Sequence, residues 1–460
     1  MSENQMSQMR SIDPAWAWKP FEPTSDQPWD RSAVSHLYRR AGFGMELSVI
    51  GEAVKREPAE VVGKLVSANR ESTEFRSTAD ALAEATLAGG DPEKLSAAWV
   101  YRLLYTPNQL LEKTAILWHG HFATGAEKVK DARMMWNQNQ LLRDHALGDF
   151  GSLVKKISQD PAMLVYLDWA VNRKAHPNEN FARELMELFC LGEGNYSETD
   201  VLELARCFTG WEIKNKRFRK NRYQHDPGEK TVLGQNGDFD GEDGVRIVLD
   251  QPAMPLFVTR KLYRFFISDE PEPTDAFLQP LADLFRERDL QIAPVVERIL
   301  GSNQFYSQHA IARKIKSPVE LVMGMLRSLG ATTNTQLVAR GLLSIGQGLF
   351  FPPNVKGWDG GRAWINSSTL LGRSNLIADI LDSDATRFDG KTLAEYLGEH
   401  DVQTTDEAMM YFEQCLLAAP LDEQAKDQLR HSTVSQPGDQ DQQMRTLLHV
   451  MMSLPISQLG

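Results

Sequence analysis

Apolar side chains recur at intervals of three and four residues along most of this chain, which is the spacing of amphipathic helices. The pattern starts near Ser32 and continues to the end of the sequence, and Pro, Gly, Asn and Asp separate the periodic segments. We therefore predict a mainly α-helical fold, with one large multi-helix domain over residues 31–460. Residues 1–30 show no period, and we expect them to form an N-terminal tail that packs on this body.

The predicted helices follow the periodic segments between these breaks. They span residues 32–40, 46–55, 58–68, 95–105, 107–122, 129–146, 252–267, 274–288, 292–301, 318–329, 334–343, 367–380, 406–417, 423–429 and 441–453, together with two helices between 176 and 211. Helical segments thus account for most of the chain.

Two segments depart from the helical period. Residues 214–234 alternate roughly between apolar and polar positions and contain Asp226-Pro227-Gly228, so we predict a small β-hairpin insertion there. Its Lys and Arg residues indicate either a solvated hairpin or an anion site. Residues 350–366 contain prolines and glycines that prevent a helix. This loop also carries Trp358 and Trp364, and we expect it to fold back over the core.

The densest polar chemistry lies in residues 176–211, where two capped helices are predicted. Pro177 is suited to the first turn of the first helix, and Gly192 to its end. Ser197 and Asp200 have the spacing of a capping box and indicate the start of the second helix.

One face of the first helix in this segment is polar. Asn180, Arg183, Glu184 and Glu187 recur there at three- and four-residue intervals, away from the apolar stripe. Arg183 has ion-pair spacing to Glu187 and also to Glu179. The face is therefore either a surface of satisfied salt bridges or the lining of a polar site.

His119 and His121 form a second candidate group. They lie two residues apart, which turns their side chains about 200° from one another on a regular helix, so one metal ion cannot bind both. Gly120 would loosen the last turn and bring them closer together. Hydrogen-bonded core histidines are the commoner role, and we predict no metal ligand. Two alternatives remain: a site assembled from separate helices, for example His121 with Glu184 and His225, and a hard cation held by carboxylates such as Asp168 and Glu184.

Composition restricts the function classes. The formal net charge of −12 gives no excess of cations for neutralising phosphates, so a general nucleic-acid binder is not expected. Three cysteines are too few for a disulfide framework, and we expect them as buried thiols. No run is long enough for a membrane span, and the first 30 residues lack the features of an export signal, so the expected location is the cytoplasm. The alternative is export together with a partner.

Nine short motifs taken together resemble the bacterial domain-of-unknown-function family 1800. They are HLYRRAGFG (36–44), WHGHF (118–122), DPAMLVYLD (160–168), HPNENFARELMELFCLG (176–192), ARCFTGW (205–211), HDPGEKTVLG (225–234), KSPVELV (316–322), PPNVKGW (352–358) and WINSSTLLGR (364–373). They occur in the order of the family and cover most of the chain. The resemblance implies no settled activity and no known cofactor. It suggests a partner, because genes of this family are often paired with genes of domain-of-unknown-function family 1501, whose members resemble alkaline-phosphatase-like hydrolases.

Two hypotheses for function follow. The first is an enzyme or ligand-binding protein with a polar pocket built from the helices of residues 176–211 and the 118–122 segment. Its candidate catalytic residues are Arg183, Glu184 and His121, and its candidate binding residues are Asn178, Glu179, Asn180, His119, His225 and Asp168. The second is a non-catalytic partner of a family 1501 hydrolase, with the 214–234 hairpin and the 350–364 loop as the contact surface.

Overall fold

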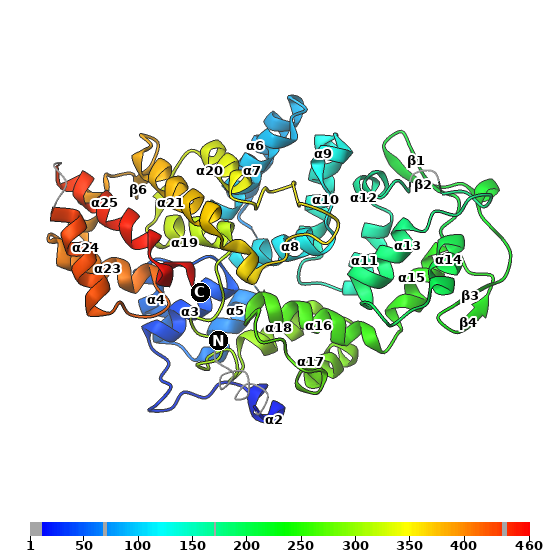
Figure 1. Cartoon of the computed structure of the whole chain (residues 1–460), viewed down its shortest axis with the longest axis horizontal. Coiled ribbons are helices and arrows are strands. Elements are labelled where there is room, and N and C mark those ends of the chain that lie inside the picture. Colours follow the sequence, from blue (N-terminus) through cyan, green and yellow to red (C-terminus); the bar gives the residue numbers. More distant parts are fainter. Residues whose placement is uncertain (1–11, 68–70, 170–171, 435–438) are drawn as a thin grey trace.

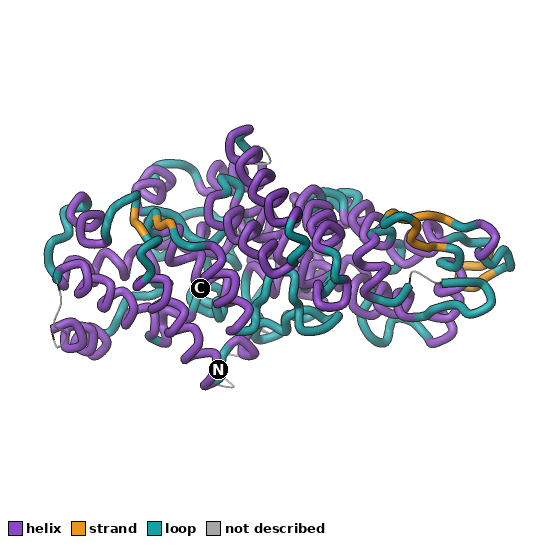
Figure 2. Tube along the Cα trace, turned by 90° about the horizontal axis from the view of Figure 1, so that it is seen from above, coloured by secondary structure: helices purple, strands orange, loops and turns teal. Residues whose placement is uncertain are grey.

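Helices make up most of the computed structural model, which describes residues 12–67, 71–169, 172–434 and 439–460 (Figure 1). The predicted mainly α-helical class is confirmed. The molecule is elongated, and two of the three two-stranded sheets lie at the end of the molecule that holds α13–α15 (Figure 2).

The elements follow the chain in this order. In the first half they are α2 (Pro14–Ala17), α3 (Arg31–Ala41), α4 (Leu47–Val54), α5 (Pro58–Ser67), α6 (Thr73–Ala88), α7 (Pro92–Tyr105), α8 (Gln109–His121), α9 (Ala126–Val129), α10 (Ala132–Asp144), α11 (Phe150–Ser158), α12 (Pro161–Tyr166), α13 (Asn180–Glu184), η1 (Leu185–Cys190), α14 (Glu198–Cys207), β1 (Trp211–Lys214), β2 (Arg217–Lys220), η2 (Arg222–Gln224), β3 (Lys230–Val232) and β4 (Gln235–Gly237). In the second half they are α15 (Gly241–Leu249), α16 (Ala253–Phe266), α17 (Asp275–Glu287), α18 (Ile292–Leu300), α19 (Pro318–Ser328), β5 (Ala331–Thr332), α20 (Thr335–Ser344), η3 (Gly361–Trp364), α21 (Ser367–Asp382), β6 (Arg387–Phe388), α22 (Leu393–Glu399), α23 (Thr405–Leu416), α24 (Glu423–Val434), α25 (Gln440–Ser453) and η4 (Pro455–Gln458).

The helices bury two hydrophobic cores. The first joins α3–α5 with α11–α18, and the second joins α7 with α19–α25. Helix α8 contributes to both, since Trp118 belongs to the first core and Ile116 to the second. The C-terminal half of α8 therefore lies where the two cores meet.

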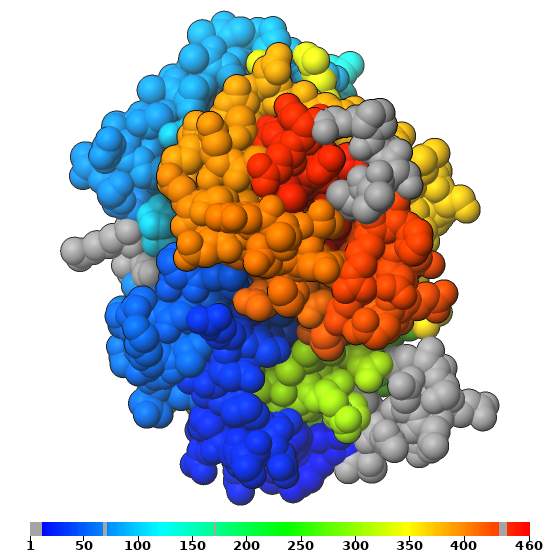
Figure 3. Space-filling model, turned by 90° about the vertical axis from the view of Figure 1, so that its left-hand side faces the viewer, coloured from blue at the N-terminus to red at the C-terminus, as the bar shows by residue number. Residues whose placement is uncertain are grey.

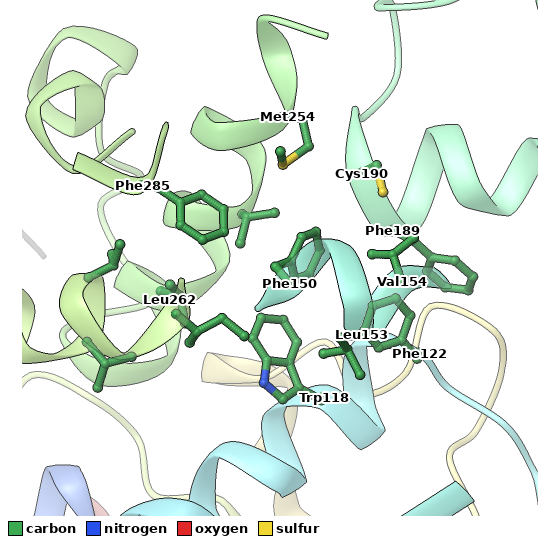
Figure 4. Packing of buried hydrophobic residues seen from close by; sticks show 14 of the residues in the cluster. Trp118, Phe122, Phe150, Leu153, Val154, Phe189, Cys190, Met254, Leu262 and Phe285 are labelled. Atoms are coloured by element: carbon green, nitrogen blue, oxygen red, sulfur yellow. The ribbon is translucent and has the colours of Figure 1, made fainter. Parts of the chain in front are cut away.

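Aromatic packing fixes the C-terminal end of α8 in the first core (Figure 4). The ring centroids of Trp118 and Phe150 are 5.5 Å apart, and those of Phe122 and Phe189 are 5.1 Å apart. The Trp118 indole also donates a hydrogen bond of 2.8 Å to the carbonyl of Ala146, so its polar edge is satisfied. The WHGHF segment is thus a rigid part of the interior.

The predicted β-hairpin insertion at residues 214–234 is two hairpins, which together span residues 211–237. β1 pairs with β2 around Asn215-Lys216, and β3 pairs with β4 around Leu233-Gly234. Both residues of each turn have positive φ, as a tight hairpin turn requires. The Asp226-Pro227-Gly228 sequence lies in the connection between the hairpins, where the Asp226 carboxylate accepts a hydrogen bond from the Gly228 amide at 2.9 Å.

Several helices differ from the predictions. The first helix of the 176–211 segment begins at Asn180 instead of Pro177, because the Asn178 side chain accepts a hydrogen bond from the Asn180 amide at 2.9 Å and forms a turn there. After Glu184 the helix continues as the π-helical turn η1, a form that often occurs at functional sites. Helices α6, α11, α12, α15 and α22 were not predicted. In α6, Ala79 and Ala83 are the only buried residues and make too weak a stripe.

The described part of the N-terminal segment packs against the body, while residues 1–11 lie outside the description. Trp18 is 3% exposed and donates a hydrogen bond of 2.7 Å to the carbonyl of Phe277 in α17. In Figure 3 the N-terminal elements lie beside the C-terminal helices, and Asp30 and Glu413 line a shared cavity between α3 and α23.

Candidate functional site

A cavity of about 150 Å³ lies where the two hydrophobic cores meet. Its walls come from α8, α16, the first turn of α19 and the loop that precedes and includes η3. The lining residues are Phe43, Lys113, Ile116, Leu117, Gly120, His121, Lys261, Arg264, Phe265, Asp269, Lys314, Ser317, Val319, Glu320, Gln347, Lys356, Trp358, Asp359, Gly360 and Trp364. Junctions between packed units are common places for ligand sites.

A buried ion pair lies on one side of the cavity. Lys113 Nζ is 2.8 Å from Glu320 Oε1 and also donates to the carbonyls of Arg39 (2.9 Å) and Gly42 (2.6 Å). Burial lowers the pKa of Lys113 to about 8, although Glu320 opposes the shift. Burial raises the pKa of Glu320, but Lys113 and Arg40 outweigh it and hold that pKa well below its usual range. Both groups are therefore charged at neutral pH.

Glu320 has a second role as a cap. Its carboxylate accepts a hydrogen bond from the Ser317 amide at 2.8 Å, and the Ser317 hydroxyl accepts from the Glu320 amide at 3.2 Å. This capping box starts α19. The Glu320 carboxylate thus caps the start of α19 and also pairs with Lys113 of α8.

A second cation of the cavity is also paired. Lys314 Nζ donates to Asp269 Oδ2 at 2.8 Å and to the carbonyl of Arg264 at 2.6 Å. Burial lowers the pKa of Lys314, and Asp269 opposes the shift. Lys113 and Lys314 thus each have an acidic partner, Glu320 and Asp269, and Arg40 shares Glu320 at 3.5 Å.

Three further cations of the cavity have no such match. The side chains of Lys261, Arg264 and Lys356 make no hydrogen bond and no ion pair within the residues that the structure describes. Asp359 is the remaining acidic residue of the lining, and it is exposed. The cavity thus has a surplus of positive charge, in a protein whose formal net charge is −12.

The cavity wall formed by the 350–366 loop is held against α8 by two glycines. Gly357 has φ of +75°, and a Cβ placed on it would overlap the carbonyl oxygen of Gly120. A Cβ on Gly120 would lie 3.2 Å from the Trp358 ring. Trp358 and Trp364 both line the cavity and are half-buried, so this part of the loop lies against α8.

His121 lies in the cavity wall as a neutral group. Its Nε2 is 3.0 Å from the carbonyl oxygen of Phe189, which is one of the free carbonyls at the end of η1, so Nε2 carries the proton. Burial, and after it the charge of Lys261, lowers the pKa of His121 to about 3. A buried neutral imidazole in this position joins α8 to the π-helical turn.

His119 faces the other way and is held by packing. Its Nε2 accepts a hydrogen bond of 3.1 Å from the Phe350 amide, and its ring contacts Trp99 at 5.2 Å between centroids. Burial lowers its pKa to about 3 as well. His119 does not line the cavity but supports the loop that does.

The polar face predicted around residue 183 is divided in the structure. Arg183 forms an ion pair of 2.6 Å with Glu198 and one of 3.3 Å with Glu179, at the molecular surface. Glu184 is half-buried, and its charge interacts with that of Lys356 in the cavity wall. Burial, and after it the charge of Glu187, raises the pKa of Glu184. Within the described residues, no side chain of 176–211 lines the cavity itself.

The remaining predicted binding residues stabilise turns. The Asn178 side chain donates to the carbonyl of Asp168 at 2.8 Å, and the Asn180 side chain donates to that of Leu167 at 3.2 Å. Asp168 has positive φ and pairs with Lys128 at 2.7 Å. His225 lies elsewhere, with Nδ1 3.0 Å from the carbonyl of Thr209. These residues do not converge on a common site.

No group of three or more His, Cys, Asp or Glu residues suited to holding a metal ion is found in the described parts of the chain. All three cysteines are buried free thiols. Nor does any described helix have the length and apolar character needed to cross a membrane.

Sequence reasoning missed the cations of the cavity. Glu320 lies within the KSPVELV motif, Lys314 two residues before it, and Lys113 five residues before the WHGHF motif. The motifs therefore marked this neighbourhood without assigning these residues a role. Lys261 and Arg264 lie in a correctly predicted helix, at i and i+3 on one face. That spacing was the available signal, but it is common on solvated helices.

Comparison with known proteins identifies one match. A family model described as "Protein of unknown function (DUF1800)" matches residues 36–459. No curated protein and no solved structure gives a significant match.

Proposed function

The chain belongs to the DUF1800 family of proteins of unknown function, and we propose that it binds a small organic anion in the cavity between α8 and α16. The observation that carries this proposal is the set of three cations, Lys261, Arg264 and Lys356, whose side chains line the cavity without an ion pair among the described residues. Lys261 and Arg264 are half-buried, and partly desolvated cations gain more from an anionic ligand than cations on an open surface do.

The size and the walls of the cavity indicate the kind of anion. A volume of about 150 Å³ is that of a cavity able to hold one benzene ring. Phe43, Phe265, Trp358 and Trp364 supply apolar and aromatic surface beside the cations. A carboxylate or phosphate on a small apolar or planar body matches this combination.

Two of the candidate catalytic residues fit this proposal. Glu184 is a half-buried carboxylate without a hydrogen-bond partner in the described chain, and its raised pKa suits a proton acceptor near the cavity rim. His121 is neutral and lines the cavity, so it adds polarity without charge. Arg183 is occupied by Glu198 and Glu179, and we assign it no ligand contact.

Matched ligand pairs test the proposal. Binding of benzoate and pyruvate, and of the uncharged benzamide and pyruvamide, is measured by calorimetry on the full chain. We expect the anions to bind at least about tenfold more tightly than the amides, a difference of roughly 1.4 kcal/mol. The double variant Lys261→Met/Arg264→Met should lose this preference.

Lys156→Met is the control for the loss of charge, because Lys156 is exposed, has no ion pair among the described residues and lies outside the cavity. Its affinities should equal those of the wild type. If neither anion binds more tightly to the wild type than to the double variant, the cavity is not an anion site.

A second candidate function is a contact with a protein partner through the two hairpins. Tyr223 is 87% exposed. Lys214, Arg217 and Arg222 are exposed near it in sequence, and their side chains have no ion pair in the described residues. Exposed Tyr and Arg side chains are frequent anchors at protein interfaces. We propose an acidic surface of a family 1501 protein as the partner.

The test of this second candidate is co-purification with a family 1501 protein of the same organism. Tyr223→Ser combined with Arg217→Ser should abolish the complex, because both the anchor and the steering charge are lost. Lys156→Met serves again as control. Unchanged co-purification of the double variant would remove the hairpins from any interface.

A further inference from the structure

Three buried or half-buried lysines of the cavity differ in what their amines can do. Lys113 donates to two carbonyls and pairs with Glu320, and Lys314 donates to a carbonyl and to Asp269. Lys261 makes no hydrogen bond or ion pair in the described residues. Its nitrogen is therefore the one of these three whose lone pair, once deprotonated, is free to react.

The helix face around Lys261 places an anion receptor beside this amine. Arg264 is one turn further along α16 and lines the same cavity. Phe257 lies one turn before Lys261, with its ring centroid 5.3 Å from Nζ. The Lys261 amine thus lies over the Phe257 ring, and Lys261 and Arg264 both line the cavity.

Resting on the proposed function and naming its substrate class, we infer that Lys261 forms an imine with the carbonyl carbon of a small 2-oxo acid whose carboxylate pairs with Arg264. The neutral Nζ attacks the carbonyl carbon, and the amine proton passes to the carbonyl oxygen to give a carbinolamine. A proton from water then lets the hydroxyl leave as water, and a protonated carbon–nitrogen double bond remains. The condensation consumes one proton, releases one water molecule and needs no oxidant or reductant.

The electrostatic surroundings favour the reactive form of the amine. Burial, and after it the charge of Arg264, lowers the pKa of Lys261, which increases the fraction of neutral amine at neutral pH. Desolvation combined with a neighbouring cation is a known way to activate a lysine nucleophile. A bound carboxylate on Arg264 would hold the carbonyl group beside the amine.

Reductive trapping tests the inference. The full chain is incubated with pyruvate, treated with sodium borohydride and digested, and the peptides are analysed by mass spectrometry. We expect one modified residue, Lys261, heavier by the mass of pyruvic acid less one oxygen atom. Lys113 and Lys314 in the same cavity, and Lys156 on the surface, should remain unmodified.

Variants separate the reaction from binding. Lys261→Arg keeps the charge, so pyruvate should still bind in the calorimeter while trapping is lost. Arg264→Met should weaken both pyruvate binding and trapping. Binding of pyruvate without a Lys261 adduct, or trapping spread equally over exposed lysines, would overturn the imine and leave the anion site intact. Absence of both binding and trapping would overturn the inference and the proposed function together.

Discussion

Lys113 Nζ lies 2.8 Å from Glu320 Oε1 in the wall of the cavity, and both residues are buried. The pair joins α8 to the start of α19, so it connects elements from both sides of the cavity. Because Lys113 is neutralised in this way, it adds little to the surplus charge, which rests on Lys261, Arg264 and Lys356.

Removal of the negative partner should destabilise the protein strongly. Glu320→Gln leaves the buried Lys113 without its counter-charge, and we expect a loss of about 3–5 kcal/mol in the free energy of unfolding. Denaturant titration at pH 7 measures this. The control is Glu84→Gln, which breaks the exposed pair with Arg133 and should leave the unfolding midpoint unchanged. Equal midpoints for Glu320→Gln and the wild type would contradict the structural role of the pair.

The shape of the cavity, and with it the ligand affinity, should depend on the close approach of Gly357 to Gly120. Gly357→Ala introduces a Cβ that overlaps the Gly120 carbonyl and displaces Trp358, so benzoate affinity should fall by about tenfold or more. Gly234→Ala has the same backbone strain, since φ is +81°, but its Cβ meets open space. It should therefore lose about 1–2 kcal/mol of stability and no affinity. Similar affinities for the two variants would mean that the contact does not shape the site.

Stability should fall as the solution is acidified below the ordinary pKa of histidine. His119 and His121 have folded-state pKa values of about 3, so between pH 6.5 and 3 the unfolded chain binds protons that the folded chain does not. The stability that each histidine contributes is fully present above pH 6.5 and is lost as the pH decreases toward 3. Between pH 7 and pH 5 we expect each histidine to lower the free energy of unfolding by about 2 kcal/mol.

Denaturant titration of His121→Gln at both pH values checks this expectation. The variant should lose about 2 kcal/mol less than the wild type over that interval, because the glutamine does not titrate. Identical pH dependence of wild type and variant would show that His121 is not held neutral.

Charge changes at the cavity rim should act in opposite directions. Lys356→Met removes an attractive charge, and Glu184→Gln removes a repulsive one that interacts with Lys356. We expect benzoate affinity to fall by about two- to fivefold in the first variant and to rise by about two- to fivefold in the second. Arg183→Met should leave the affinity unchanged, because Arg183 is paired with Glu198. An equal change of the same sign in both rim variants would exclude a charge effect.

The helical class could be predicted because periodicity and caps agree along the chain. The Ser197–Asp200 capping box forms as its spacing indicated. The sequence gives no comparable signal for η1, since a π-helical turn depends on which carbonyls remain free for neighbours such as His121. Local pattern thus predicts elements better than it predicts irregular turns.

The cavity was harder to predict, because its character depends on which charges are compensated. Glu320 and Lys113 are distant in sequence and meet only through the tertiary fold. Arg183 and Glu184 are adjacent in sequence, yet one pairs at the surface and the other interacts with Lys356. A dense polar motif therefore indicated the neighbourhood of the cavity rather than its lining.

A crystal structure of the full chain with 4-bromobenzoate tests the anion site most directly, because anomalous scattering locates the bromine atom. We predict that the carboxylate binds between Lys261 and Arg264, with the ring against Trp358. The same soak of Lys261→Met/Arg264→Met should show no bromine in the cavity. Bromine found only outside the cavity in the wild type, or equally in the cavity of both proteins, would contradict the proposed anion site.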